Sequence, residues 1–154
     1  MLAIGDRAPD FSATDDSGRR WTLAELLAEG EFVLYFYPAD FTPVCTREAC
    51  MFRDVYPDLA DAGVRIFGVS PQGEGSHRSF REKHRLPFPL LADTNKSLTT
   101  RFGAQGPLGM GVRRVSYLID AEGRIADLVV ADLRVGRHEA FVRRVLDRHA
   151  RRRN

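Results

Sequence analysis

Short apolar runs alternate with amphipathic segments along this chain. Runs rich in β-branched and aromatic residues, each short enough for a buried strand, occupy residues 32–37, 64–70, 88–93, 113–120 and 125–130. Segments with apolar residues at helical spacing occupy residues 23–30, 45–63, 77–86, 97–104 and 137–153. Because strands alternate with helices, the pattern predicts an α/β fold with a mixed central sheet flanked by helices.

Turn and breaker residues add detail to this pattern. An Asp-Ser-Gly turn at residues 16–18 interrupts an alternating segment, which predicts an N-terminal β-hairpin. Pro57 lies inside the longest helical segment, where it should kink the helix or begin a second one. The chain has no internal repeat or linker, and its 154 residues suit a single domain over residues 1–154.

Composition narrows the class of protein. Lysine and arginine number 23 against 21 aspartates and glutamates, a balance that indicates neither a nucleic-acid nor a membrane partner. No apolar run approaches the roughly 20 residues that a membrane span needs. The first residues lack a basic region followed by an apolar stretch, so we expect no secretory signal and a cytoplasmic location.

The only two cysteines, Cys45 and Cys50, follow directly after a predicted buried strand. Two cysteines are too few for a disulfide-stapled scaffold, and such a pair is more often catalytic or metal-binding. Cys45 follows the loop at residues 39–44, where we expect a helix to begin. The unpaired amides of a helix start favour a thiolate and hence a nucleophile. The alternative is an inert buried thiol.

The spacing of the cysteines argues against a structural disulfide. Five positions along a helix amount to a rise of about 7.5 Å and a rotation of about 140°. The two Cα atoms would then lie roughly 8–9 Å apart, beyond the usual disulfide range of about 4.4–6.8 Å. The pair suits a redox cycle in which the first helical turns unwind before the sulfurs bond. Cys50 as a plain core residue of the helix remains the alternative.

Other cysteine chemistries fit less well. A thioredoxin-type pair has two residues between its cysteines, and this pair has four. A structural zinc site needs four ligands, and the histidines are scattered: His77, His84, His138 and His149. We expect these histidines to be surface or packing groups. No glycine-rich phosphate loop is present, so a nucleotide enzyme is not indicated.

The residues around the cysteines resemble a known active-site motif. Pro38, Thr42 and Cys45 are similar to the Pro-x-x-x-Thr-x-x-Cys motif of the peroxiredoxins, which are AhpC/TSA-like proteins. A second cysteine after four intervening residues resembles the peroxiredoxin Q or bacterioferritin-comigratory-protein branch. The likeness extends over nearly the whole chain, through "GDRAPDF", "VRIFGVSPQ", "LPFPLLAD" and "RRVSYLIDAEGRI". It implies a thioredoxin-like fold and thiol peroxidase activity.

The resemblance also implies roles for individual residues. Cys45 matches the peroxidatic nucleophile and Cys50 the resolving thiol. Thr42 matches the hydroxyl that hydrogen-bonds the peroxide and the sulfur, and Pro38 the proline that walls the pocket. Glu48 matches the acidic residue that orients an arginine.

That arginine precedes the strand at "VSYLID", which places it at Arg114, while Arg113 should point to the opposite face. The chain departs from the branch at Phe41 and Val44, where a polar residue and a glycine are usual. Both side chains are bulkier and more apolar, so pocket shape and peroxide preference stay open.

The resemblance implies a complete reaction cycle. A peroxide substrate oxidises Cys45 to a sulfenic acid, Cys50 forms an intramolecular disulfide with it, and thioredoxin or a similar dithiol reduces the disulfide. No metal or organic cofactor is needed, and we expect a monomer or weak dimer. The alternatives are a general thiol–disulfide oxidoreductase and a redox sensor or holdase.

Overall fold

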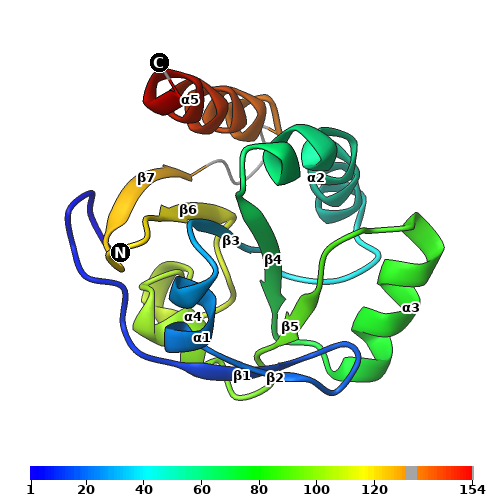
Figure 1. Cartoon of the computed structure of the whole chain (residues 1–154). Coiled ribbons are helices and arrows are strands. Elements are labelled where there is room, and N and C mark those ends of the chain that lie inside the picture. The colour runs from blue at the N-terminus through cyan, green and yellow to red at the C-terminus, as the bar shows by residue number, and fades with distance from the viewer. Residues whose placement is uncertain (131–134, 154) are drawn as a thin grey trace.

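A twisted mixed sheet forms the centre of the molecule, which the computed structural model describes over residues 1–130 and 135–153 (Figure 1). Within these residues its seven strands follow the order β2-β1-β5-β4-β3-β6-β7. The strands are β1 (Ser12–Asp15), β2 (Arg20–Thr22), β3 (Phe32–Phe36), β4 (Arg65–Ser70), β5 (Leu90–Ala92), β6 (Val115–Ile119) and β7 (Ile125–Val130). Strands β3, β4 and β5 are parallel and the other pairings are antiparallel. The predicted mixed sheet and N-terminal hairpin are confirmed.

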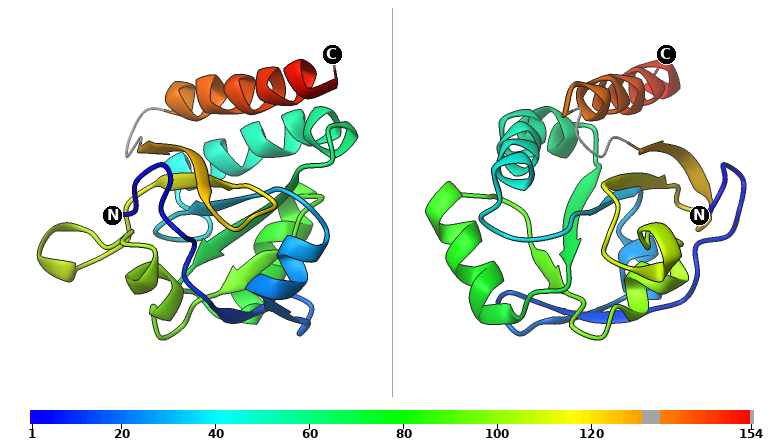
Figure 2. Two further views of the ribbon diagram at one scale, coloured as in Figure 1. Left: turned by 60° about the vertical axis from the view of Figure 1, so that its left-hand side comes forward. Right: turned by 180° about the vertical axis from the view of Figure 1, so that it is seen from behind.

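Helices cover both faces of this sheet (Figure 2). They are α1 (Leu23–Ala28), α2 (Pro43–Asp61), α3 (Glu74–His84), α4 (Ser97–Arg101) and α5 (Val135–Arg153), with a short 3₁₀ turn at Pro107–Gly109. Side chains of α2, α3 and α5 form one apolar cluster with the sheet, and those of α1 and α4 form the other. Helix α2, which carries both cysteines, therefore packs on the sheet beside its neighbour α5.

Strand β3 shows why the sheet separates the two clusters. All five of its residues are buried, as expected for a central strand covered on both sides. Successive side chains point to opposite faces. Phe32, Leu34 and Phe36 enter the cluster under α1 and α4, while Val33 and Tyr35 enter the cluster under α2.

Helix boundaries differ from the predicted ones, most clearly in α2 and α3. Helix α2 runs without a break from Pro43 to Asp61, so a second helix beginning at Pro57 is wrong. Helix α3 begins at Glu74, three residues earlier than predicted, because its polar first turn carries no apolar periodicity. No helix in the described part of the chain is long and apolar enough to cross a bilayer.

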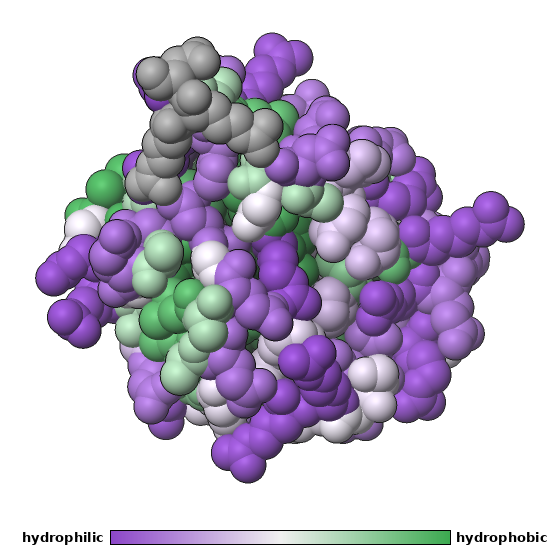
Figure 3. All heavy atoms as spheres, viewed as in Figure 1, coloured by the Kyte–Doolittle hydropathy of each residue, from purple (hydrophilic) through white to green (hydrophobic). Residues whose placement is uncertain are grey.

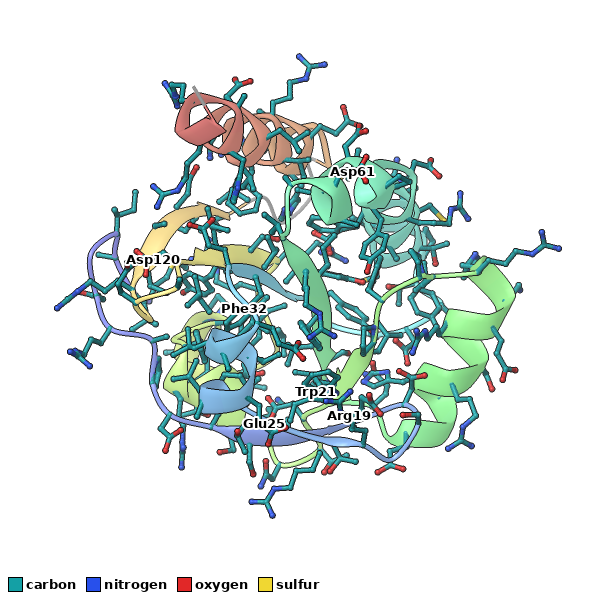
Figure 4. All side chains as sticks on the ribbon, viewed as in Figure 1. Arg19, Trp21, Glu25, Phe32, Asp61 and Asp120 are labelled. Carbon is teal, nitrogen blue, oxygen red and sulfur yellow. The ribbon has the colours of Figure 1, made fainter. Side chains whose placement is uncertain are left out.

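The hairpin is anchored to the core by Trp21, which is almost fully buried. Its indole Nε1 donates a hydrogen bond to Asp15 at 2.9 Å, and the Arg19 guanidinium lies 3.6 Å from the ring centre (Figure 4). Hydrophilic residues dominate the face drawn in Figure 3, with apolar side chains in small separate groups. The hydrophobic surface is thus mostly turned inward against the sheet.

Packing between β4 and α2 leaves no room beside Gly68. A Cβ there would lie 2.7 Å from Leu90 Cδ2 and 2.9 Å from the ring of Tyr35, which stacks on Phe52 of α2 at 4.6 Å. We expect Gly68→Ala to lower the free energy of unfolding by about 1–3 kcal/mol, the usual range for an overpacked core. Denaturant titration measures this change.

Gly75→Ala is the matched control, since a Cβ at this position in α3 meets no atom within 4 Å. That variant should be as stable as the native protein or more stable, because alanine restricts the unfolded chain. Equal stability of Gly68→Ala and the native protein would contradict the packing argument.

Candidate active site

Cys45 lies at the point where β3 passes into α2. The strand ends at Phe36, a loop follows, and Thr42 is the N-cap of the helix. Pro43 occupies the first helical position, where its fixed φ and missing amide proton do no harm. Cys45 is the third residue of α2 and is 1% exposed. The predicted helix start is confirmed, so the sulfur lies beside amide groups that carry partial positive charge.

Arg114 supplies a full positive charge to the same sulfur. Its Nη2 donates to Cys45 Sγ at 3.2 Å. The contact arises because β6 pairs with β3 in antiparallel fashion, so Val115 lies opposite Phe36. Arg114 therefore stands beside the end of β3, although it is 69 positions from the cysteine along the chain. Arg114 and the first amides of α2 thus both place positive charge beside the buried sulfur.

The N-cap residue directs its hydroxyl away from the helix. Thr42 Oγ1 donates to the carbonyl oxygen of Ala39 at 2.8 Å, and its side chain caps no amide of α2. The proton of the hydroxyl is thus committed to the loop, while the oxygen keeps acceptor capacity. Such an oxygen is suited to accept a hydrogen bond from the O–H of a hydroperoxide.

Asp40 ties the loop to α3. Its carboxylate accepts hydrogen bonds from the Tyr37 hydroxyl at 2.6 Å and the Ser76 hydroxyl at 2.8 Å, and lies 2.6 Å from His77 Nδ1. The other ring nitrogen of His77 faces the carbonyl oxygen of Leu91 at 3.0 Å. Both ring nitrogens of His77 therefore face oxygen atoms, which fixes the orientation of the ring.

The charged state of Asp40 follows from these contacts. Burial raises the pKa of its carboxyl group, but hydrogen bonds from His77 and Tyr37 outweigh burial and hold the pKa below its ordinary value. Gln72 adds two backbone contacts, accepting from the Asp40 amide at 3.0 Å and donating to the Pro38 carbonyl at 3.1 Å. The loop that carries Pro38 and Thr42 is therefore held in place before any substrate arrives.

Phe41 forms an apolar rim next to this loop. Its backbone has φ 65°, a left-handed conformation that is uncommon outside glycine, and its side chain is 47% exposed. The ring packs edge-on against Phe80 at 5.2 Å. The clamped loop is what holds this side chain in an unfavourable backbone conformation at the surface.

Glu48 points into the protein from the same face of α2 as Cys45. It is fully buried, and its Oε2 lies 2.8 Å from Nε2 of His138, a buried residue of α5. Nδ1 of His138 in turn lies 3.1 Å from the hydroxyl of Ser116. The expected role of Glu48, orienting Arg114, stays a proposal, since the ion-pair contact that the structure gives it is with His138.

Cys50 lies on a different face of α2. It is half-buried and unbonded, and it lines a groove between α2 and α5 together with Met51, Val55, Val142 and Leu146. The helix that separates it from Cys45 is continuous. This arrangement agrees with the expectation that an intact helix keeps the two thiols apart.

Sequence reasoning missed the side chains that support the site. His77 and His138 were expected to be surface or packing groups, yet both are fully buried and face carboxylates. No local pattern marks them, because their partners are 37 and 90 positions away. Only Asp40, inside the motif loop, carried a signal that could have been followed. Among the described residues no cluster of side chains could hold a metal ion.

The hydrogen bonds that Asp40 accepts should make the free energy of unfolding depend on pH in the acid range. Because its folded pKa lies below the ordinary value of 3.8, its stabilising effect is complete above about that pH. It is lost as the pH falls through the folded value. We expect Asp40→Asn to lower the free energy of unfolding at pH 7 by about 1–3 kcal/mol, the cost of unsatisfied buried partners. Denaturant titrations from pH 7 to pH 3 measure it.

The difference between native protein and variant should shrink below about pH 4, where the native carboxylate is also lost. Asp54→Asn is the control, because that carboxylate is 68% exposed. A constant difference at every pH would mean that the charge of Asp40 contributes nothing.

Comparisons with known proteins agree with this site. The model of the AhpC/TSA family matches residues 4–128. Peroxiredoxin Bcp of Bacillus subtilis is 42% identical over 131 residues, which cover 80% of this chain and 82% of that protein. The crystal structure of peroxidoxin BcpB from Mycobacterium tuberculosis superposes with a TM-score of 0.87 at 32% identity, covering 96% and 97% of the two chains.

A second similar structure comes from work on alkyl peroxide reduction by the bacterioferritin comigratory protein of Xanthomonas campestris. It has a TM-score of 0.84 at 29% identity and covers 97% of this chain and 98% of that one. The fold of this chain is the thioredoxin-like fold of these proteins.

Proposed function

The chain belongs to the AhpC/TSA family and is a peroxiredoxin of the bacterioferritin-comigratory-protein type, and from this premise we propose how its residues divide the reaction. Cys45 is the peroxidatic thiol and Cys50 the resolving thiol. The substrates are hydrogen peroxide and organic hydroperoxides, and a thioredoxin-type dithiol restores the enzyme. One observation carries the assignment: the Arg114 guanidinium lies 3.2 Å from a buried sulfur at the start of α2.

The first step is attack of the Cys45 thiolate on one peroxide oxygen. An S–O bond forms and the O–O bond breaks, so the sulfur is oxidised to a sulfenic acid while the other oxygen leaves as an alcohol or water after protonation. Negative charge grows on the departing oxygen. Arg114 and the first amides of α2 are donors already in place for it, and Thr42 orients the peroxide by accepting its O–H.

The second step joins the two cysteines. The Cys50 sulfur attacks the sulfenic sulfur, a disulfide forms, and the sulfenic oxygen leaves as water. Because an intact helix holds the thiols too far apart, the segment from Cys45 to Cys50 unwinds first. A dithiol of the thioredoxin type then reduces the disulfide by thiol–disulfide exchange and is itself oxidised.

Apolar groups at the pocket support organic hydroperoxides among the substrates. Phe41 is half-exposed next to the motif loop, and Val44 precedes the nucleophile. Removal of an alkyl chain from water against this apolar rim is favourable, and a polar residue or a glycine at these positions would provide less apolar contact. The alkyl peroxide reduction named for the Xanthomonas campestris relative is consistent with this choice.

Substitution of each cysteine tests the division of labour. Cys45→Ser should abolish peroxide consumption, because serine supplies no thiolate. Cys50→Ser should react once, stop at a sulfenic acid, and lose thioredoxin-dependent turnover. Stopped-flow oxidation with hydrogen peroxide and with an organic hydroperoxide, followed by mass spectrometry with a sulfenate trap, measures both results. A Cys45→Ser variant that still consumes peroxide would overturn the assignment.

Substitution of the two neighbouring arginines tests the source of positive charge. Arg114→Ala should lower the second-order rate constant for peroxide about 10²–10³-fold, the usual effect of removing one preorganised donor. Arg113→Ala is the matched control, because it removes an equal charge one position away. We expect a much smaller loss there. A larger effect of Arg113→Ala would show that the wrong arginine was assigned.

A further inference from the structure

Three buried polar residues form a connection that the reaction described above does not use. Glu48 of α2 and His138 of α5 are both fully buried, with 2.8 Å between Oε2 and Nε2. His138 Nδ1 lies 3.1 Å from Oγ of Ser116, a buried residue of β6. The imidazole of His138, which belongs to α5, therefore connects α2 to β6. Helix α5 lies alongside α2 (Figure 2).

The two ends of this connection flank the reactive sulfur. Glu48 is three residues after Cys45 and two before Cys50, inside the segment that must unwind. Ser116 is two residues after Arg114, so the two side chains leave their strand on the same face. His138 thus contacts both the helical segment that carries the cysteines and the strand that positions Arg114.

The contact offsets the burial of a carboxylate. Within the described residues neither oxygen of Glu48 accepts an aligned hydrogen bond. A buried carboxylate without a partner is strongly disfavoured. The imidazole nitrogen at 2.8 Å is the polar group that the structure sets against it. On the other side of the ring, the Ser116 hydroxyl lies within hydrogen-bond distance of Nδ1.

Disulfide formation must break this contact. When residues 45–50 leave the helix, Glu48 moves with them, while His138 stays on α5. The contact therefore exists in the helical form that binds peroxide and is absent from the disulfide form. An interaction present in only one of two states shifts their equilibrium by its own free energy.

We propose that His138 is a positioning residue that holds the start of α2 in its helical, peroxide-reactive form. The contacts among Glu48, His138 and Ser116 form a latch that must open before Cys50 can reach Cys45. This inference rests on the proposed function, since it presumes the sulfenic acid and disulfide steps.

The latch affects which of two reactions the Cys45 sulfenate undergoes. While the helix is intact, the sulfenate can react with a second peroxide, gaining one oxygen to become a sulfinic acid as that peroxide leaves as alcohol or water. Once the helix opens, Cys50 forms the disulfide instead. A tight latch thus favours over-oxidation, and a loose one favours the disulfide.

The experiment measures this partition in the full-length protein. Native and His138→Ala proteins are reduced, treated with increasing hydrogen peroxide without a reductant, and analysed by intact mass spectrometry. We expect the ratio of sulfinic acid to disulfide to fall about two- to tenfold in His138→Ala, because one buried polar contact is lost. His138→Gln, whose amide can still donate toward Glu48, should restore part of the ratio.

Val145→Ala is the matched control. Val145 is a buried residue of the same helix, and its truncation weakens the packing of α5 without removing a polar contact. An unchanged ratio in His138→Ala, or an equal fall in Val145→Ala, would overturn the proposal. If His138→Ala does not fold, Ser116→Ala replaces it in the same experiment. We expect the ratio of sulfinic acid to disulfide to fall in this variant as well, and an unchanged ratio would contradict the proposal.

A second readout separates this proposal from the proposed function. Amide hydrogen exchange in the reduced protein needs no peroxide. Exchange at residues 44–53 should be faster in His138→Ala than in Val145→Ala. Faster exchange with no peroxide consumption by the native protein would leave the latch intact and overturn the peroxidase assignment. Equal exchange with normal peroxidase activity would overturn the latch alone.

Discussion

A buried sulfur needs positive charge beside it before it can act as a nucleophile, and the structure is arranged around that need. Cys45 is 1% exposed, so water cannot stabilise its thiolate. The first turn of α2 contributes partial charges, and Arg114 contributes a full charge at 3.2 Å. The helix start and the arginine come together only because β3 and β6 are paired.

The two sides of the sulfur differ in how firmly they are held. On one side, hydrogen bonds of Asp40, His77 and Gln72 tie the motif loop to α3 and to the end of β4. On the other side, the side chain of Thr42 caps no amide at the start of α2. A rigid loop preserves the pocket, while a less secured helix start can open for Cys50.

Both carboxylates near the site face a histidine from a later helix. Asp40 meets His77 of α3, and Glu48 meets His138 of α5. Removing one member of a buried pair leaves an uncompensated polar group, which makes these positions sensitive to substitution. The difference lies in their segments: under the proposed mechanism, Asp40 belongs to a loop that keeps its place, and Glu48 to the helical turns that unwind. Similar chemistry thus serves a fixed contact in one place and a reversible contact in the other.

Local patterns determined the elements of this protein and its reactive residues. Periodicity and turn residues predicted the hairpin, the strands and the helices, and the motif around Pro38, Thr42 and Cys45 indicated the chemistry. Secondary structure and sequence motifs can be predicted in this way because each depends on residues that are close together in the chain. Residue spacing also predicted that an intact helix keeps Cys50 from Cys45. The continuity of α2 through Pro57 and the burial of His77 and His138 were decided by the tertiary structure. Their packing and partners come from segments remote in sequence, and no local pattern encodes which segments the sheet brings together.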